Sequence, residues 1–105
     1  MNAIINPIKN FQIGQILSSE LVYSDIMNTE NFSEFCEKCL QRHQICDWGD
    51  MPDEDKQSND DALIGEGRIV SGYIIPEEIK GRFSKIWIIT EWDRSVTTIL
   101  YPSEY

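Results

Sequence analysis

Two runs of β-branched and aromatic residues near the end of the chain form its clearest hydrophobic pattern. They cover residues 86–90 (IWIIT) and 96–101 (VTTILY), and a short polar segment separates them. Two such runs around a possible turn are typical of a β-hairpin. In the first run both alternating sets of residues are apolar. We therefore expect this strand to lie in the centre of a sheet and to be covered on both faces.

Alternation of apolar and polar residues predicts two further strands, at 11–17 and at 68–75. Spacings of three and four predict helices at 20–27, from Asn31 onwards, and at 51–64. The second helix has the strongest pattern, with one apolar stripe made of Phe32, Phe35, Cys36, Cys39, Leu40 and His43.

The break before the third helix contains turn-forming residues. Gly49 is suited to a positive φ, and Asp50 is a candidate to cap the helix, with Pro52 in its first turn. A connection at 77–81 has room for one helical turn. The third helix is polar apart from a narrow edge, so it needs help to dock on the sheet.

The element order predicts an α+β fold. A strand and three helices precede the last three strands, which indicates an antiparallel sheet of about four strands with about three helices packed on one face. The chain has 105 residues, of which 41% are hydrophobic, enough for one core. We predict a single domain that covers residues 1–105.

The charge balance narrows the classes of partner. There are 18 acidic residues against 9 Lys and Arg, which leaves a net charge of −9. Such a protein repels phosphate backbones and attracts basic surfaces, so direct binding of nucleic acid is disfavoured. No apolar run approaches the ~18 residues of a membrane span, and no secretory leader is recognisable. Three cysteines crowded into eleven residues do not form a disulfide framework. We expect a soluble, cytoplasmic protein with reduced thiols.

Most of the negative charge lies in one segment, residues 47–66, where Lys56 is the sole basic residue. Its acids are Asp47, Asp50, Asp53, Glu54, Asp55, Asp60, Asp61 and Glu66. No EF-hand loop can be laid on them. They form either a solvated helix face or a surface that imitates DNA phosphates and binds a basic protein groove.

Trp48 lies among these acids, at the break before the third helix. It is either a buried anchor for the acidic helix or an exposed hot spot in a binding surface. We favour the anchor, because the helix has few apolar residues of its own. The predicted partner-binding set consists of the eight acids and Trp48.

The pattern Cys36-x2-Cys39-x3-His43-x2-Cys46 looks like a zinc site. On one continuous helix, however, Cys36 and Cys46 would lie about 15 Å apart, too far to share a metal ion. We therefore expect core packing, no metal and no cofactor. A Cys–His nucleophile or metal site, and with it a small enzyme, is the alternative.

Glu91, Asp93 and Arg94 cluster at the predicted hairpin turn. They can be interpreted as an acid/base pair with an anion clamp, but short-range ion pairs in a turn are commoner. No Gly-rich phosphate loop or other catalytic motif supports an enzyme, and we predict none.

Several strings in the second half of the chain carry a family resemblance. They are DWGD (47–50), DK (55–56), ND (59–60), RI (68–69), KIWIITE (85–91), DRSVTTIL (93–100), Pro102 and EY (104–105). In these strings residues 47–105 resemble a family of small acidic proteins encoded on plasmids, conjugative elements and phage-like islands of gut-type bacteria. The first 45 residues match it only in general pattern. Labels for such proteins include "plasmid-related protein" and type I restriction-modification subunit, but 105 residues without a Gly-rich cofactor loop are too few for a methyltransferase.

The resemblance implies a mobile-element context, and it transfers no catalytic residue. Small acidic proteins from that context are often inhibitors of host defence, including anti-CRISPR and anti-restriction proteins. We therefore predict a non-enzymatic inhibitor that binds the basic surface of a CRISPR effector or another defence nuclease. The alternatives are the small Cys/His enzyme or metal-binding protein above, and a mobile-element interaction module with another partner.

Overall fold

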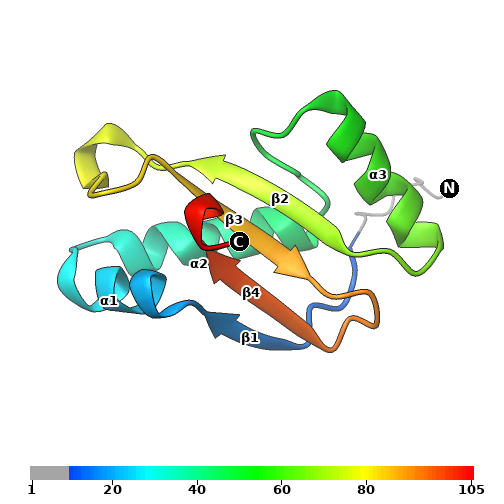
Figure 1. Ribbon diagram of the computed structural model, residues 1–105, viewed down its shortest axis with the longest axis horizontal. Helices are drawn as coiled ribbons and strands as arrows, with labels where there is room; N and C mark the ends of the chain where they lie inside the picture. Colours follow the sequence, from blue (N-terminus) through cyan, green and yellow to red (C-terminus); the bar gives the residue numbers. More distant parts are fainter. Residues whose placement is uncertain (1–9) are drawn as a thin grey trace, which may run out of the picture.

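The structure is a computed structural model, and it describes residues 10–105. Residues 1–9 of the predicted domain lie outside this part. The elements follow in the order β1 (Gln15–Ser18), α1 (Glu20–Asn28), α2 (Phe32–Gln44), α3 (Asp53–Ile64), β2 (Ile69–Ile74), β3 (Lys85–Thr90) and β4 (Val96–Leu100), with 3-10 turns η1 (Glu77–Ile79) and η2 (Pro102–Glu104) (Figure 1). The predicted α+β class is confirmed, with three helices and a four-stranded sheet within residues 10–105.

The sheet is mixed rather than purely antiparallel. Its strand order is β1-β4-β3-β2, and β3 runs antiparallel to both of its neighbours, so its predicted central place is confirmed. β1 runs parallel to β4, with the Ser19 N–H bonded to the carbonyl of Ile99. The direction of β1 depends on how the chain returns through the helices, β2 and β3. Alternation of residue types does not carry that information.

β1 begins at Gln15, four residues after the start of the predicted strand at 11–17. Gly14 has a φ of +63°, and a Cβ atom there would lie 2.2 Å from the carbonyl oxygen of Ser95. The chain therefore needs glycine at the point where it turns into the sheet beside the β3–β4 hairpin.

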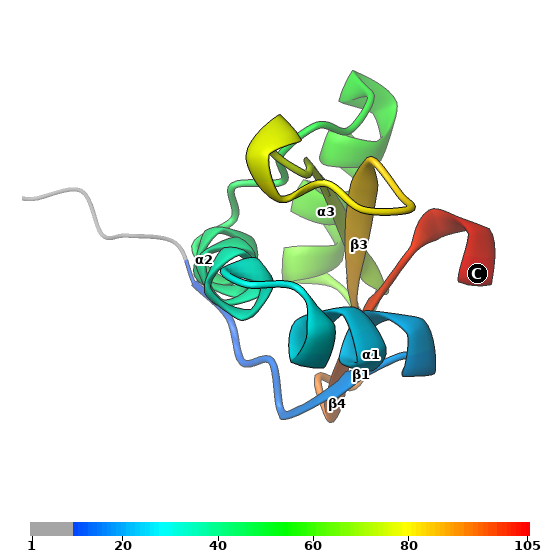
Figure 2. The same cartoon turned by 90° about the vertical axis from the view of Figure 1, so that its left-hand side faces the viewer.

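Helix α2 and the chain after β4 lie on different sides of the sheet. α2 covers one face, and η2 lies across the opposite face (Figure 2). The main core fills the space between the sheet and α1 and α2, and consists of Val22, Phe32, Cys36, Cys39, Tyr73, Ile75, Ile86, Ile88, Ile99 and Tyr101. The opposite face is covered only in part, and Trp87 on β3 is half-buried there. The predicted cover on both faces of β3 is thus incomplete.

Candidate functional site

The acidic helix α3 is held against the edge of β2 that faces away from β3. At Val70 a side chain, that of Asn59, makes the hydrogen bonds that a neighbouring strand would otherwise make. Asn59 is 3% exposed, donates from Nδ2 to the carbonyl of Val70 at 2.8 Å, and accepts the Val70 N–H at Oδ1 at 3.0 Å. One amide thus satisfies both backbone groups of a residue on a sheet edge. This places the outer face of α3 at the side of the sheet, in solvent (Figure 1).

The chain before α3 covers the next part of the same edge. The N–H of Gly72 donates to the carbonyl of Trp48, and the N–H of Asp50 donates to the carbonyl of Gly72 at 2.7 Å. The Asp50 carboxylate accepts the N–H of Ile74 at 3.0 Å. Asp50 was predicted to cap α3, and this prediction is wrong, because the N-cap is Pro52 and makes no side-chain hydrogen bond. The carboxylate serves the unpaired sheet edge instead.

Trp48 is a buried anchor, the alternative that the sequence favoured. It is 5% exposed and packs with Ala62 and Ile69 in a second hydrophobic cluster. Its indole N–H donates to Asp60 Oδ1 at 3.1 Å. Because the ring is covered, Trp48 does not belong to the free surface, and its inclusion in the partner-binding set is corrected.

Two further predicted site acids, besides Asp50, have structural partners. Asp47 forms an ion pair with Arg42, in which Nε and Oδ2 lie 2.7 Å apart, and this hydrogen bond lowers the pKa of the Asp47 carboxyl. Asp60 is exposed but accepts the Trp48 indole N–H. Asp47 and Asp60, like Asp50, therefore orient the chain around α3.

The remaining five predicted acids form what we call the acidic surface: Asp53, Glu54, Asp55, Asp61 and Glu66. All five side chains are exposed. The four ion pairs within residues 10–105 engage other carboxylates, those of Asp25, Asp47, Glu77 and Glu91. Within residues 10–105, therefore, no carboxylate of the acidic surface forms an ion pair.

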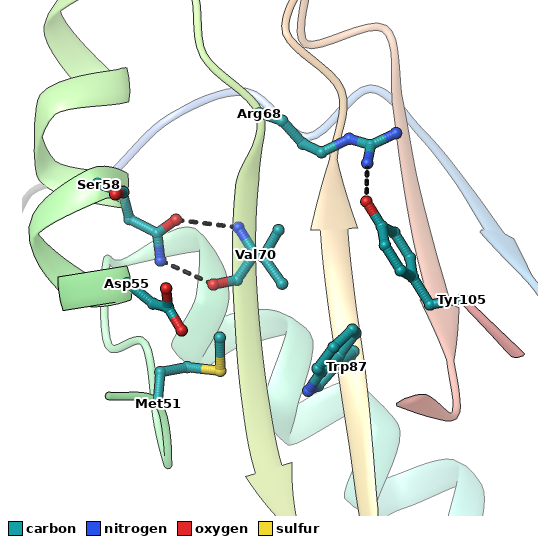
Figure 3. A pocket seen from close by; sticks show the side chains of 8 residues that line it. Met51, Asp55, Ser58, Arg68, Val70, Trp87 and Tyr105 are labelled. Carbon is teal, nitrogen blue, oxygen red and sulfur yellow. Dashed lines mark hydrogen bonds between the residues drawn. The ribbon is translucent and has the colours of Figure 1, made fainter. Parts of the chain in front are cut away.

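An aromatic recess, which the sequence did not predict, lies between α3 and the open face of the sheet. It has a volume of about 240 Å³, and its lining includes Met51, Asp55, Arg68, Val70, Trp87 and Tyr105. Figure 3 shows Asp55 on the α3 side and Trp87 on the β3 side, with Val70 and Met51 between them. These residues are far apart in sequence, so their meeting depends on the strand register. The sequence contains one feature that could have pointed to the recess, namely the apolar residue Trp87 on the second face of β3.

The cysteines of α2 lie in the core. Cys36 and Cys39 are buried, and desolvation raises the pKa of each thiol to about 12. Within the described residues, no three His, Cys, Asp or Glu side chains are placed so that they could hold a metal ion. The helix runs unbroken from Phe32 to Gln44, as the stripe predicted. The buried thiols are therefore poor nucleophiles in this arrangement.

His43 is fully buried and belongs to a chain of hydrogen bonds across the sheet. Its Nδ1 lies 2.5 Å from the Ser71 hydroxyl and its Nε2 lies 2.8 Å from that of Thr90. Thr90 is bonded to Thr97, which donates to the carbonyl of Ile13. Because the Ile13 carbonyl can only accept, Thr97 donates to it, and Thr90 in turn donates to Thr97. The Thr90 hydroxyl must then accept from His43, so the neutral imidazole carries its proton on Nε2. Its Nδ1 accepts from the Ser71 hydroxyl. Desolvation lowers the pKa of His43 to about 3, so the ring stays neutral.

The polar residues of the hairpin turn have structural partners. Glu91 pairs with Arg68, and Asp93 accepts from Ser95. Arg94 has a φ of +61° and donates to the carbonyls of Ala62, Gly67, Glu91 and Trp92. The guanidinium therefore fastens the turn to the end of α3. The catalytic interpretation of this turn gains no support from the geometry.

Comparison with protein-family models, with curated proteins and with solved structures finds no match. Among residues 10–105, no helix has both the length and the apolar character that a membrane crossing requires.

Proposed function

We propose that this protein is a non-catalytic inhibitor of a bacterial defence nuclease, of the anti-CRISPR or anti-restriction type. The acidic surface occupies the basic groove in which the nuclease holds nucleic acid. The protein acts in the bacterial cytoplasm, where such nucleases work. The observation that carries the proposal is the exposure of five carboxylates that form no ion pair within the described chain.

The charge density of α3 is comparable to that of one DNA strand. The helix has 12 residues, so it is about 18 Å long. One strand of B-DNA carries a phosphate every 3.4 Å of axis, or about five over this length. α3 carries five carboxylates and one lysine, a net charge of −4. A groove built to bind phosphates therefore meets a similar field, and long-range steering raises the association rate.

The burial of three of the four Cys and His candidates also favours binding over catalysis, whereas Cys46 is half-buried. Cys36, Cys39 and His43 are each at most 3% exposed, and a substrate reaches none of them without opening the core. The mobile-element family that residues 47–105 resemble supplies the class of partner, a host defence nuclease.

The experiment is a phage-restriction assay. The protein is expressed in bacteria that carry either a type I restriction enzyme or a CRISPR effector, and the efficiency of plaquing of a targeted phage is measured. We expect plaquing to rise by at least tenfold in one of these strains. No rise in any strain across a panel of both types would overturn it.

Two variants of equal charge test the role of the acidic surface. The first carries Asp53→Asn, Glu54→Gln, Asp55→Asn, Asp61→Asn and Glu66→Gln. The control neutralises five exposed acids elsewhere, Glu20, Glu30, Glu34, Glu37 and Glu78, each to Gln. We expect the first variant to lose inhibition and the control to keep it. Equal inhibition by both would reject the electrostatic mechanism, because their net charges are identical.

A further inference from the structure

The aromatic recess has a flat apolar wall, the indole of Trp87. Trp87 lies opposite Gly72 in the β2–β3 register. A Cβ atom at Gly72 would lie 2.8 Å from Lys85 Cε, 3.0 Å from the Met51 sulfur and 3.1 Å from Trp87 Cδ1, so the glycine lets these side chains close over the strand. The Lys85 ammonium itself donates to the carbonyl of Asp50. The ring of Tyr105 meets the Trp87 ring edge-on, at a centroid distance of 5.6 Å. The indole is thus held in place and half-buried.

The rim of the recess carries one uncompensated negative charge. Asp55 is exposed and forms no ion pair within residues 10–105. Arg68, which also lines the recess, already pairs with Glu91 and donates from its guanidinium to the hydroxyl of Tyr105 at 2.5 Å. Its charge is therefore engaged on the far side from Asp55 (Figure 3).

This combination selects a particular ligand chemistry. An anion is repelled by Asp55 and by the rest of the acidic surface. A neutral apolar group would remove water from Asp55 without replacing its hydrogen bonds, which is costly. A cation with a flat apolar face avoids both penalties. Guanidinium has that shape, stacks on indole rings and binds carboxylates with two hydrogen bonds, whereas ammonium is compact and more strongly hydrated.

We propose that the aromatic recess binds an arginine side chain of a basic partner, with the guanidinium stacked on Trp87 and paired with Asp55. The inference deepens the proposed function and rests on it for the basic character of the partner. The acidic surface then supplies attraction at long range, and the recess supplies a specific anchor of the kind that dominates many interfaces.

The test uses three acetylated and amidated peptides, GSRGSRGSRG and its lysine and citrulline counterparts, titrated into the ¹⁵N-labelled full chain. The NMR signal of the Trp87 indole N–H reports on the recess, and its loss in Trp87→Phe assigns it among the three tryptophans. We expect a saturable shift with the arginine peptide, at least fivefold weaker binding of the lysine peptide, and no saturable shift with citrulline. An unmoved Trp87 signal, or equal affinity for arginine and lysine, would overturn the proposal.

Asp55→Asn and Asp53→Asn form a matched pair, because both remove one exposed carboxylate from the first turn of α3. Only Asp55 lines the recess. We expect Asp55→Asn to weaken binding of the arginine peptide about tenfold and Asp53→Asn to weaken it less than twofold. Equal losses would mean a general field effect and reject the site. The spectrum of each variant shows directly that it is folded.

The peptide titration tests the recess and the phage assay tests nuclease inhibition, so a negative result in one does not imply a negative result in the other. An arginine-selective recess without relief of restriction would reject the proposed nuclease inhibition and leave the recess assigned. Relief of restriction that survives Asp55→Asn unchanged, together with an unmoved Trp87 signal, would reject the recess and leave the acidic surface as the inhibitor's contact.

Discussion

The indole N–H of Trp48 donates a hydrogen bond to the carboxylate of Asp60, 3.1 Å away. The bond joins a buried ring, in the segment that covers the edge of β2, to the solvent face of the helix that carries the acidic surface. The position of that surface therefore depends on a residue that is itself 5% exposed.

Replacing Trp48 by Ala should destabilise the domain strongly. The substitution removes the ring from its cluster and leaves a cavity beside Ala62 and Ile69, which costs about 3–5 kcal/mol. Chemical denaturation measures the loss, and hydrogen exchange should show faster exchange in α3. Trp92→Ala is the matched control, because Trp92 is 57% exposed, and should change stability by less than about 0.5 kcal/mol. Similar losses in the two variants would contradict the anchor.

Asn59→Ala should loosen α3 without removing any apolar contact. Both hydrogen bonds to the backbone of Val70 are lost, at about 1 kcal/mol each. We expect a total loss of about 2 kcal/mol and faster exchange of the Val70 amide. Ser58→Ala, one residue earlier on an exposed position, is the control. An unchanged Val70 exchange rate in Asn59→Ala would show that the edge is protected in another way.

Stability should fall as the pH is lowered from 7.5 to 5 because of His43. Its pKa is about 3 in the folded protein, against about 6.5 when unfolded. Below pH 6.5 the unfolded chain binds a proton that the folded chain does not, so acid favours unfolding, by about 2 kcal/mol at pH 5. Denaturant titrations at several pH values measure this dependence. His43→Gln, which keeps a donor and an acceptor but does not titrate, should flatten the curve over this range. An equally steep curve in that variant would assign the dependence to other groups.

Gly49→Ala should be among the most damaging small substitutions in the chain. Gly49 has a φ of +72°, and a Cβ atom there would lie 2.1 Å from the carbonyl oxygen of Gly72, a backbone atom that also accepts the Asp50 N–H. The β2 edge must therefore shift, and we expect a loss of more than about 2 kcal/mol by thermal or chemical denaturation. At Gly81 an added Cβ meets nothing within 4 Å, so Gly81→Ala should be nearly neutral. Equal effects at both glycines would count against the close approach.

Most elements of this fold can be predicted from the sequence because each has its own local pattern. The stripe from Phe32 to His43 marks α2, alternation marks β2, and the paired β-branched runs mark the hairpin of β3 and β4. Trp48 was assignable as an anchor because α3 has almost no apolar residues of its own. These inferences need only neighbours along the chain, where a periodicity of two or of three to four corresponds directly to a buried face.

The rest was decided by contacts between segments distant in sequence. The parallel pairing of β1 with β4 depends on the path of the chain between them, and the acids of residues 47–66 look alike until their partners are known. Asp47 meets Arg42, Asp50 meets the edge of β2, and Asp60 meets Trp48. The recess likewise exists only because strand register brings Trp87 near α3 and Tyr105. Sequence alone determined which residues are charged or apolar. The tertiary structure decided which carboxylates remain in water, because packing determines whether a hydrogen-bond or ion-pair partner within the chain lies near each of them.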